Sequence, residues 1–333
     1  MAKKKARKST KKVKVALIGA GGMANGVHYP SLAGFKDVEL VGLCDLVPEK
    51  VKATADKFGI KKTFSDYREM LAETKPKAVY ALMPPHHLYD VAMDIIQAGL
   101  DLFIEKPPAV TTFQTDCLAR AAAKRKLITG VGFQRRYHPL FTRCLKAVRK
   151  HGPIHQTVAT FYKNLPPTEI HPYYRGAIDI LTSDAVHVVD ALRYFCGGEV
   201  RRVASDVRKI DCWYDTCFNA IVSFDNGATG ILLANWRCGS RRLTLELHSP
   251  GSSAYMDAGG SAHVFADNKP LFETGHIDEA GSESMHVHQG FCAQARAFID
   301  AVKSRHQLHN NLPDAVKTMR LVEQIFGNNI SDN

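Results

Sequence analysis

Two stretches far apart in the chain hold side chains that could move protons. Glu105 and Lys106 follow a short apolar run and precede two prolines. Asp184, His187 and Asp190 are spaced three residues apart, so on a helix they would share one face. A carboxylate beside an imidazole orients the ring and raises its proton affinity, as a general base requires. Taken alone, the first stretch is also compatible with a solvated ion pair, and the histidine with a hydrogen-bonded core residue.

The position of the Glu-Lys pair favours a functional role. Residues 102–104 form a short apolar run bounded by turn signals, which is typical of a buried parallel strand. Ligands in open α/β sheets bind beyond the carboxyl ends of the strands, where this pair would lie. Pro107 cannot donate to a sheet ladder and therefore ends the strand.

A glycine-rich turn near the start of the chain predicts a dinucleotide site. The β-rich run 13–18 leads into Gly19, Ala20, Gly21, Gly22, Met23 and Ala24. The first glycine makes the turn, the second lets the backbone approach a pyrophosphate, and the small third position lets helix and strand pack closely. The following helix would direct its amides and positive dipole end at the phosphates. Glycine turns are common, but this strand–turn–helix context strengthens the interpretation.

An acid after the second strand indicates which dinucleotide is bound. The run 38–44 ends in Asp45, which could accept hydrogen bonds from the adenosine ribose hydroxyls and would repel a 2′-phosphate. Leu46 follows, with no arginine immediately beside the acid. We therefore expect NAD, with NADP the less favoured cofactor. The structural alternative for Asp45 is a turn or N-cap acid before a helix that starts at Pro48.

The first half of the chain alternates strands with helices. Predicted strands cover 13–18, 38–44, 78–82, 102–104 and 128–132, and predicted helices cover 48–58, 65–71, 89–98 and 111–124. Such alternation predicts βαβ units in a doubly wound parallel sheet.

The second half has a different pattern. Predicted strands cover 200–210, 216–224, 229–236, 243–248 and 253–256, and predicted helices cover 140–149, 178–195, 288–303 and 313–326. The hairpin signal Asp225-Asn226-Gly227 joins two of the strands, so we expect an antiparallel sheet.

Seven pieces in this order resemble the glucose–fructose oxidoreductase / inositol dehydrogenase / MocA (Gfo/Idh/MocA) family. They are Gly19-x-Gly21-x-x-Ala24, Cys44-Asp45, Met83-Pro84-Pro85, Ala98-Gly99, Glu105-Lys106-Pro107, Gly132-Phe133-Gln134-Arg135-Arg136 and His187-x-x-Asp190-x-x-Arg193. The resemblance implies a Rossmann domain over 13–133, after a basic tail at 1–12. It also implies an α/β domain over 134–330 with a large, mostly antiparallel sheet, whose open face forms a dimer or tetramer interface.

The resemblance further implies an NAD(P)-dependent oxidoreductase that acts on a sugar, a sugar derivative or a cyclitol. The cofactor-binding residues would be Gly19, Gly21, Gly22, Met23, Ala24, Asp45, Met83, Pro84, Glu105, Lys106 and Gln134. The substrate-binding residues would be Arg135, Arg136, Tyr173, Arg175, Asp184 and His187. The two arginines could bind hydroxyls, carboxylate or phosphate, although a surface basic pair on a loop is the plain alternative.

Three residues are expected to perform the reaction. His187 would take the proton of the substrate hydroxyl, and Lys106 would stabilise the charge that develops on its oxygen. Asp184, or failing that Asp190, would orient His187. Relatives carry the acid four residues before the histidine, where this chain has Ser183, so the partner of His187 stays open. The resemblance also implies a cis Lys106–Pro107 bond, a form accessible mainly before proline.

Composition excludes several other classes of protein. Eight of the eleven net positive charges come from Lys3, Lys4, Lys5, Arg7, Lys8, Lys11, Lys12 and Lys14, which leaves +3 for the rest. We expect a disordered solvated tail there rather than a specific nucleic-acid site, since no aromatic residues are interleaved. A localisation signal or nonspecific polyanion contact is the alternative. No apolar run suits a signal peptide or a membrane span.

The cysteine and histidine patterns indicate the compartment and argue against a metal. The eight cysteines form no C-x-x-C pair, and most lie in apolar stretches, so we expect free buried thiols in the cytoplasm. The late histidines lack metal-ligand spacing, and no metal is predicted. Two other functions remain open: an NAD-dependent glycosidase that oxidises its substrate transiently, and a non-catalytic nucleotide-binding sensor, as in a galactose-regulon repressor that resembles this family.

Overall fold

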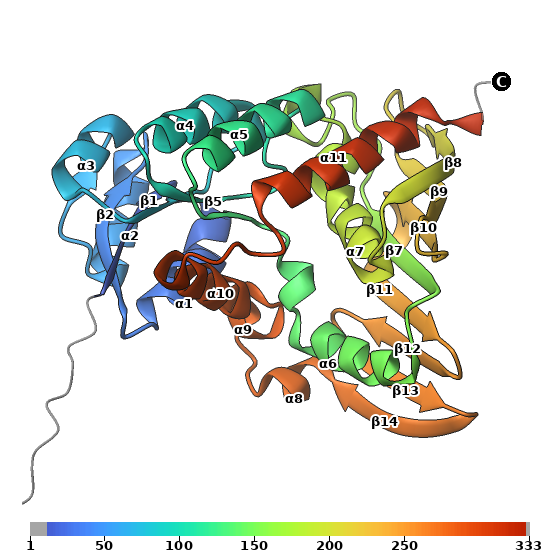
Figure 1. Cartoon of the computed structure of the whole chain (residues 1–333). Helices are drawn as coiled ribbons and strands as arrows, with labels where there is room; N and C mark the ends of the chain where they lie inside the picture. The colour runs from blue at the N-terminus through green and yellow to red at the C-terminus, as the bar shows by residue number, and fades with distance from the viewer. Residues whose placement is uncertain (1–11, 331–333) are drawn as a thin grey trace, which may run out of the picture.

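The computed structural model describes residues 12–330, so the predicted basic tail lies outside the described residues except for Lys12. The described chain forms two sheets, each with its own order of strands. Figure 1 shows them as the two ends of the molecule, with helices packed between and around them.

Six strands of the first half form the predicted parallel sheet, in the order β3-β2-β1-β4-β5-β6. They are β1 (Val13–Ile18), β2 (Val38–Cys44), β3 (Thr63–Phe64), β4 (Ala78–Ala81), β5 (Asp101–Ile104) and β6 (Thr129–Val131). The strand order reverses between β1 and β4, where a doubly wound sheet opens a crevice at its carboxyl edge. The loops after β1, β4 and β5 therefore meet at one place.

Helices cover both faces of this sheet (Figure 1). They are η1 (Ala24–His28) with α1 (Tyr29–Ala33), α2 (Pro48–Phe58), α3 (Tyr67–Thr74), α4 (Pro85–Gln97) and α5 (Thr112–Lys124). The α4 helix starts earlier than the predicted residue 89, because Pro85 occupies its first turn, where a missing N–H costs nothing. Its buried residues pack with those of α5 in one continuous core.

Eight strands of the second half form the large sheet, in the order β14-β13-β12-β11-β7-β10-β9-β8. They are β7 (Gln156–Asn164), β8 (Val200–Arg208), β9 (Cys217–Phe224), β10 (Thr229–Asn235), β11 (Arg237–Ser249), β12 (Ser252–Asp257), β13 (Ser261–Ala266) and β14 (Lys269–Gly275). Only β7 and β10 pair in parallel, so the predicted mostly antiparallel sheet is confirmed. The predicted hairpin at Asn226-Gly227 joins β9 to β10.

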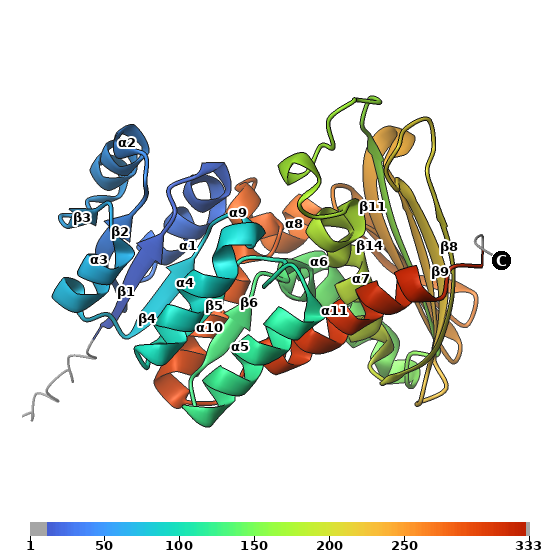
Figure 2. The ribbon, with the colours of Figure 1, turned by 90° about the horizontal axis from the view of Figure 1, so that it is seen from above.

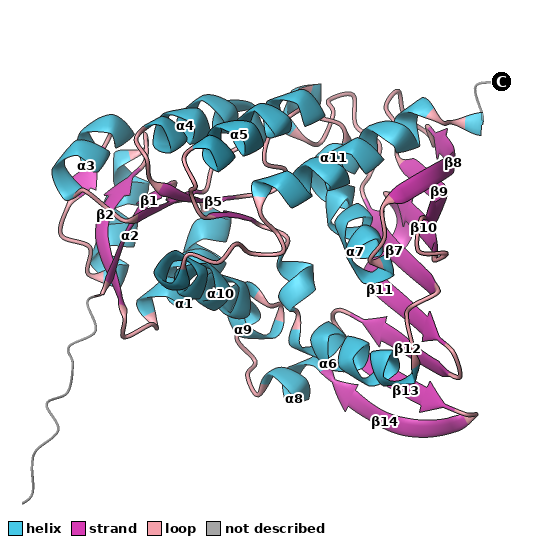
Figure 3. Ribbon diagram, viewed as in Figure 1, coloured by secondary structure: helices cyan, strands magenta, loops and turns pink. Residues whose placement is uncertain are grey.

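The helices of the second half lie on one face of this sheet and between the two sheets (Figures 2 and 3). They are η2 (Gln134–Tyr137), α6 (Pro139–Val148), η3 (Arg149–His151), η4 (Tyr174–Gly176), η5 (Leu181–Ala185), α7 (Val186–Cys196), α8 (His276–Ala280), α9 (Met285–His288), α10 (Phe291–Ser304) and α11 (Leu312–Gly327). The predicted helix 178–195 begins with the π-helical turn η5 and becomes α-helical only in α7.

Late parts of the chain return to the first sheet. Phe298 of α10 makes edge contacts with the rings of Tyr80 on β4 and Phe103 on β5. The division predicted between 13–133 and 134–330 stays a prediction, but α10 belongs to the core beneath the parallel sheet. Within residues 12–330, no helix has the length and apolar character that a bilayer crossing requires.

Candidate functional site

The glycine turn has the geometry that a phosphate cradle needs. Gly19 has a φ of +111°, and a Cβ there would lie 2.1 Å from the carbonyl oxygen of Leu82, so only glycine fits. At Gly21 and Gly22, an added Cβ would meet no atom within 4 Å. The backbone is therefore open on that side, where helix η1–α1 begins. Met23 is half exposed, and Ala24 is buried as close helix–strand packing requires.

Asp45 is fixed against this turn. One carboxylate oxygen accepts from the amide of Ala20 at 2.7 Å, and the other accepts from the amide of Val47 at 3.0 Å. The first bond ties the end of β2 to the turn after β1. Leu46 projects into solvent beside it. The carboxylate keeps lone pairs for further donors such as ribose hydroxyls.

The other predicted cofactor residues follow neighbouring strands at the same edge. Met83 and Pro84 come after β4, where Met83 packs against the core and Pro84 caps α4. Glu105 and Lys106 follow β5, and their next bond, Lys106–Pro107, is cis, as the family resemblance implies. Gln134 follows β6 and is buried, with its side-chain oxygen unpartnered among the described residues.

Glu105 has a partner that the sequence did not indicate. His28, in the helix after the glycine turn, lies 2.6 Å from Glu105 Oε1 through its Nε2. The other carboxylate oxygen accepts from the Lys106 amide at 3.0 Å. Burial alone would raise the pKa of Glu105, but His28 and Lys106 hold it below its ordinary value. A lone histidine in a helix gave no signal, because its partner lies 77 residues away.

The Lys106 side chain crosses from the first sheet to the π-helical turn. Its Nζ donates to the carbonyl oxygen of Ser183 at 2.8 Å and lies 3.9 Å from Asp184 Oδ1. Burial lowers the pKa of this lysine, while Asp184 and Glu105 oppose that shift.

Asp184 does not pair with His187, so that prediction is wrong. Its carboxylate forms an ion pair with Lys163 and accepts from the Tyr173 hydroxyl, in addition to facing Lys106. The π-helical turn explains the difference, since its wider winding removes the three-residue spacing that an α-helix would place on one face. Burial would raise the pKa of Asp184, but the charges of Lys106 and Lys163 hold it low.

Asp190, the second candidate partner, belongs to the buried framework instead. It accepts from Arg136 Nε and from the Thr318 hydroxyl, each at 2.8 Å. Arg136 also reaches Asp314 at 2.6 Å, and its side chain is only 1% exposed. The prediction that Arg136 binds substrate is therefore wrong, because its guanidinium is enclosed and paired with two carboxylates.

His187 lines the cavity. Its Nδ1 is enclosed and forms no hydrogen bond within residues 12–330. Burial lowers its pKa well below the ordinary 6.5, and the positive charges of Lys106, Arg135 and others act in the same direction. The ring is accordingly neutral near pH 7 and able to accept a proton.

The remaining predicted substrate residues separate into two groups. Arg135 lines the cavity and donates to the side chain of Gln289. Tyr173 lies behind the cavity wall and contacts the lining residue Asp184. Its hydroxyl donates to Asp184 and accepts from Trp236 Nε1 at 3.0 Å. Arg175 is exposed on the same loop and is not among the described residues that line the cavity.

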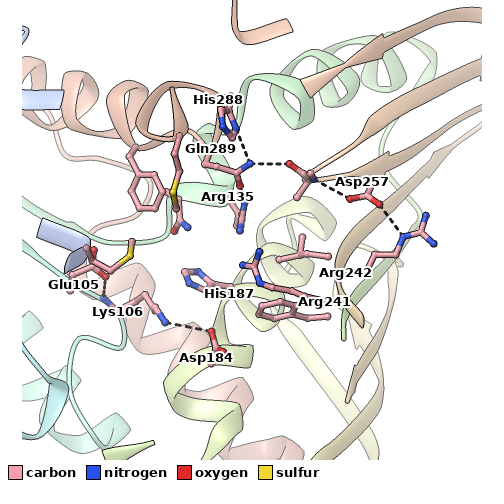
Figure 4. Close-up of a pocket in the computed structure, with 18 residues that line it drawn as sticks. Glu105, Lys106, Arg135, Asp184, His187, Arg241, Arg242, Asp257, His288 and Gln289 are labelled. Carbon is pink, nitrogen blue, oxygen red and sulfur yellow. Dashed lines mark hydrogen bonds and ion pairs between the residues drawn. The ribbon is translucent and has the colours of Figure 1, made fainter. Parts of the chain in front are cut away.

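The cavity between the two sheets has a volume of about 440 Å³, a size that suits a small ligand. Figure 4 shows Glu105 and Lys106 on one side, with His187 and Asp184 beside them. Further lining residues that the sequence did not indicate are Phe161, Arg241, Arg242, Asp257, Met285, His288 and Gln289. They lie on β-strands and short helices far along the chain, and only the fold brings them together.

Comparison with known proteins gives consistent results. The family model described as "Oxidoreductase family, NAD-binding Rossmann fold" matches residues 13–133. The model described as "GFO/IDH/MocA C-terminal domain" matches residues 147–253.

Among curated proteins, a D-glucoside 3-dehydrogenase of Escherichia coli is 32% identical over 38% of this chain and 36% of its own length. The uncharacterized oxidoreductase YrbE of Bacillus subtilis is 26% identical, over 58% of this chain and 57% of its own length. A myo-inositol 2-dehydrogenase of Thermotoga maritima is 24% identical over 88% of this chain and 89% of its own length. The chain thus aligns with only part of the first two relatives.

Solved structures share the fold along nearly the whole chain. A dehydrogenase from Chromobacterium violaceum superposes with a TM-score of 0.85 at 21% identity, over 97% of this chain and 96% of its own. A levoglucosan dehydrogenase in complex with NADH and levoglucosan gives 0.83 at 19% identity, over 97% and 98%.

Proposed function

This chain belongs to the Gfo/Idh/MocA family of oxidoreductases, and we propose that it transfers hydride between NAD and a hydroxyl-bearing carbon of a sugar, a sugar derivative or a cyclitol. The observation that carries the proposal is the meeting of Lys106 and His187 in one cavity, whose wall also includes Met23 of the glycine turn. A proton acceptor and a cationic donor thus lie beside the predicted cofactor cradle.

The chain's own residues fit the cofactor. The open side of Gly21 and Gly22 would receive the pyrophosphate, and Asp45 the adenosine ribose. When bound, NAD supplies a nicotinamide carbon that accepts hydride. The carboxylate of Asp45 and the exposed Leu46 beside it favour NAD over NADP.

In the oxidative direction, His187 takes the proton of the substrate hydroxyl. Its lowered pKa keeps the ring unprotonated near neutral pH, while making it a weaker base than an imidazole paired with a carboxylate. Lys106 donates a hydrogen bond to the same oxygen and stabilises the negative charge that develops on it. Asp184 acts through Lys106, because its carboxylate faces the ammonium group and is itself held by Lys163 and Tyr173. In the reductive direction the proton returns from His187 to the oxygen.

The names of relatives support the substrate class. They include a D-glucoside 3-dehydrogenase, a myo-inositol 2-dehydrogenase and a levoglucosan dehydrogenase. These are dehydrogenases of polyhydroxylated compounds, so neither the glycosidase nor the non-catalytic sensor is favoured.

A panel of sugars and cyclitols, each with NAD and NADP, tests the proposal through the absorbance of the reduced cofactor. We expect NAD reduction with at least one member and weaker reduction of NADP. A cofactor-saturated protein that oxidises no member of a broad panel would contradict the proposed activity.

We also infer an oligomer formed through the open face of the second sheet, in the cytoplasm. Apolar side chains stand exposed on that sheet, among them Ile221, Tyr255 and Phe265, and an exposed apolar surface favours association. All eight cysteines are free, as in a reducing compartment. Light scattering of the wild type and of Ile221→Lys tests the first inference, with a smaller mass expected for the variant. Imaging of a tagged chain in its host tests the second.

A further inference from the structure

We propose that the substrate carries an anionic group, a carboxylate or a phosphate, which Arg135 and Arg241 bind away from the reacting carbon. The inference rests on the proposed function, because it names the class of substrate that the same cavity takes. It follows from two cavity arginines that lack a carboxylate partner.

Arg135 is a buried cation whose polar atoms are only partly used. The residue is 5% exposed and lies in the short helix η2 at the junction of the two sheets. Its hydrogen-bond partner is the neutral amide of Gln289, and its Nε has no partner within residues 12–330. A buried guanidinium without an ion-pair partner is costly, and a ligand that supplies a negative charge reduces that cost.

Arg241 reaches the cavity from β11 and is itself exposed to solvent. Figure 4 shows it next to His187. Its guanidinium carbon lies 5.7 Å from the centre of the Phe161 ring, and in the described part of the chain it forms no ion pair. An aromatic ring holds a guanidinium in place without neutralising it.

The acids around the cavity are already engaged. Glu105 is bonded to His28, and the single carboxylate of Asp184 serves both Lys106 and Lys163. The third acid, Asp257, pairs with Arg242 at 2.9 Å. Within residues 12–330, Arg135 and Arg241 therefore form no ion pair, and only the more distant charge of Asp184 attracts Arg135.

The electrostatic consequences agree with this arrangement. Burial lowers the pKa of Arg135 to about 10, and the positive charge of Arg241 contributes in the same direction. Both arginines also lower the pKa of His187. A bound carboxylate or phosphate would relieve this mutual repulsion and accept paired N–H donors from a planar guanidinium. An uncharged sugar can accept hydrogen bonds from the guanidinium groups through its hydroxyls, but it cannot relieve this repulsion.

Matched substrates test the inference. Each uncharged sugar is assayed beside its uronic acid and its 6-phosphate, as with D-glucose, D-glucuronate and D-glucose 6-phosphate, and the galactose set. We expect kcat/KM for an anionic member to exceed that of its uncharged partner by roughly 10- to 100-fold, the range for a hydrogen-bonded charge. The uronate and phosphate arms show which anion the site takes.

Arg241→Gln should abolish this preference while leaving the affinity for NAD unchanged. The matched control is Arg208→Gln, which removes an exposed arginine of β8 that pairs with Asp206 outside the cavity. The control should keep the anion preference of the wild type. Equal loss in both variants would mean that only the net charge of the protein matters, and it would overturn the assignment of Arg241.

Failure of this inference and failure of the proposed function give different results. Turnover of uncharged sugars at least as efficient as that of their anionic partners would overturn the inference and keep the dehydrogenase. If no sugar is oxidised, calorimetric titration of the NADH-saturated protein with D-glucuronate, D-galacturonate and D-glucose 6-phosphate decides. Binding that Arg241→Gln removes supports the anion site even then, and no binding of any of the three overturns it.

Discussion

The glycine turn depends on residues that are neighbours in the sequence, whereas the substrate cavity depends on contacts between residues that are far apart in the sequence. At the turn, neighbouring residues act mainly through backbone geometry, as the positive φ of Gly19 and the uncrowded backbone at Gly21 illustrate. In the cavity, side chains act through partners that are distant in the chain: Lys106 bonds to Ser183, and Glu105 to His28, each 77 residues away. Local geometry can be inferred from a motif, whereas the choice of partner depends on the whole fold.

The largest expected effect comes from the adjacent residues Arg135 and Arg136, of which one lines the cavity and the other belongs to the buried framework. Arg136→Met should lower the free energy of unfolding by about 3–5 kcal/mol, because it leaves Asp190 buried without its cation, whereas Asp314 keeps Arg193. Urea denaturation followed by circular dichroism measures this change.

The matched variant is Arg135→Gln, which should affect kcat/KM far more than stability because Arg135 faces the cavity. If Arg136→Met is as stable as the wild type and has a raised KM, Arg136 binds substrate and is not the structural residue described above.

Lys106→Met tests the cavity side of the comparison. We expect kcat to fall roughly 10²- to 10³-fold, the effect of removing one donor to a developing oxyanion. The affinity for NAD should change little, because the glycine turn and Asp45 remain intact. Stopped-flow turnover and fluorescence titration with NADH measure the two quantities.

The control for this variant is Lys317→Met, whose lysine pairs with Glu199 at the surface. Both measured quantities should stay at their wild-type values in the control. Lys106→Met with wild-type turnover would show that another group stabilises the substrate oxygen.

The same contrast explains what the sequence could and could not predict. The apolar runs of β1, β4 and β5 and the glycine turn specify a parallel sheet locally, and those elements appear where expected. The pairing of Asp184 with His187 was inferred from α-helical spacing, which the π-helical turn η5 does not have. The sequence around Arg241 gave no signal, because the proposed role of this arginine depends on the cavity that the fold builds and not on its neighbours in the chain.

Strand β14 was missed because its sequence lacks a clear pattern of buried positions. Most side chains of β14 are exposed or half-buried, so the strand lacks the apolar alternation that marks a sheet face. It pairs with β13 at the edge of the sheet, where backbone hydrogen bonds decide the structure.

Substitutions at Gly19 and Gly21 should distinguish the contribution of the turn to stability from its contribution to cofactor binding. Gly19→Ala should destabilise the protein by roughly 2 kcal/mol or more, since its Cβ would meet the Leu82 carbonyl in a backbone conformation that alanine disfavours. Gly21→Ala should leave stability within about 0.5 kcal/mol, because no atom crowds its Cβ.

Gly21→Ala should nevertheless weaken NAD binding roughly tenfold, because the methyl group would occupy the side that the pyrophosphate approaches. Thermal unfolding and NADH titration of both variants distinguish the two effects. If Gly21→Ala binds NADH with the affinity of the wild type, the pyrophosphate does not bind at this face of the turn.

The smallest expected effect is a shift in the pH profile. His187 must be unprotonated to accept a proton, and burial with nearby positive charges holds its pKa below 6.5. The acidic limb of kcat/KM should therefore lie below pH 6.5, with activity lost as the pH falls through the pKa of the folded protein. Arg241→Gln removes one positive charge, so the pKa of His187 should rise and the limb should move to higher pH.

The direction of this shift tests whether Arg241, which is far from His187 in the sequence, contributes to the lowered pKa of the histidine. Arg208→Gln changes the net charge equally but lies outside the cavity, so its limb should coincide with that of the wild type. His187→Gln should remove the limb together with most of the activity, which assigns the limb to this ring. A limb that stays in place in Arg241→Gln, or moves to lower pH, would mean that Arg241 does not act on His187 and that the cavity is less tightly coupled than its geometry indicates.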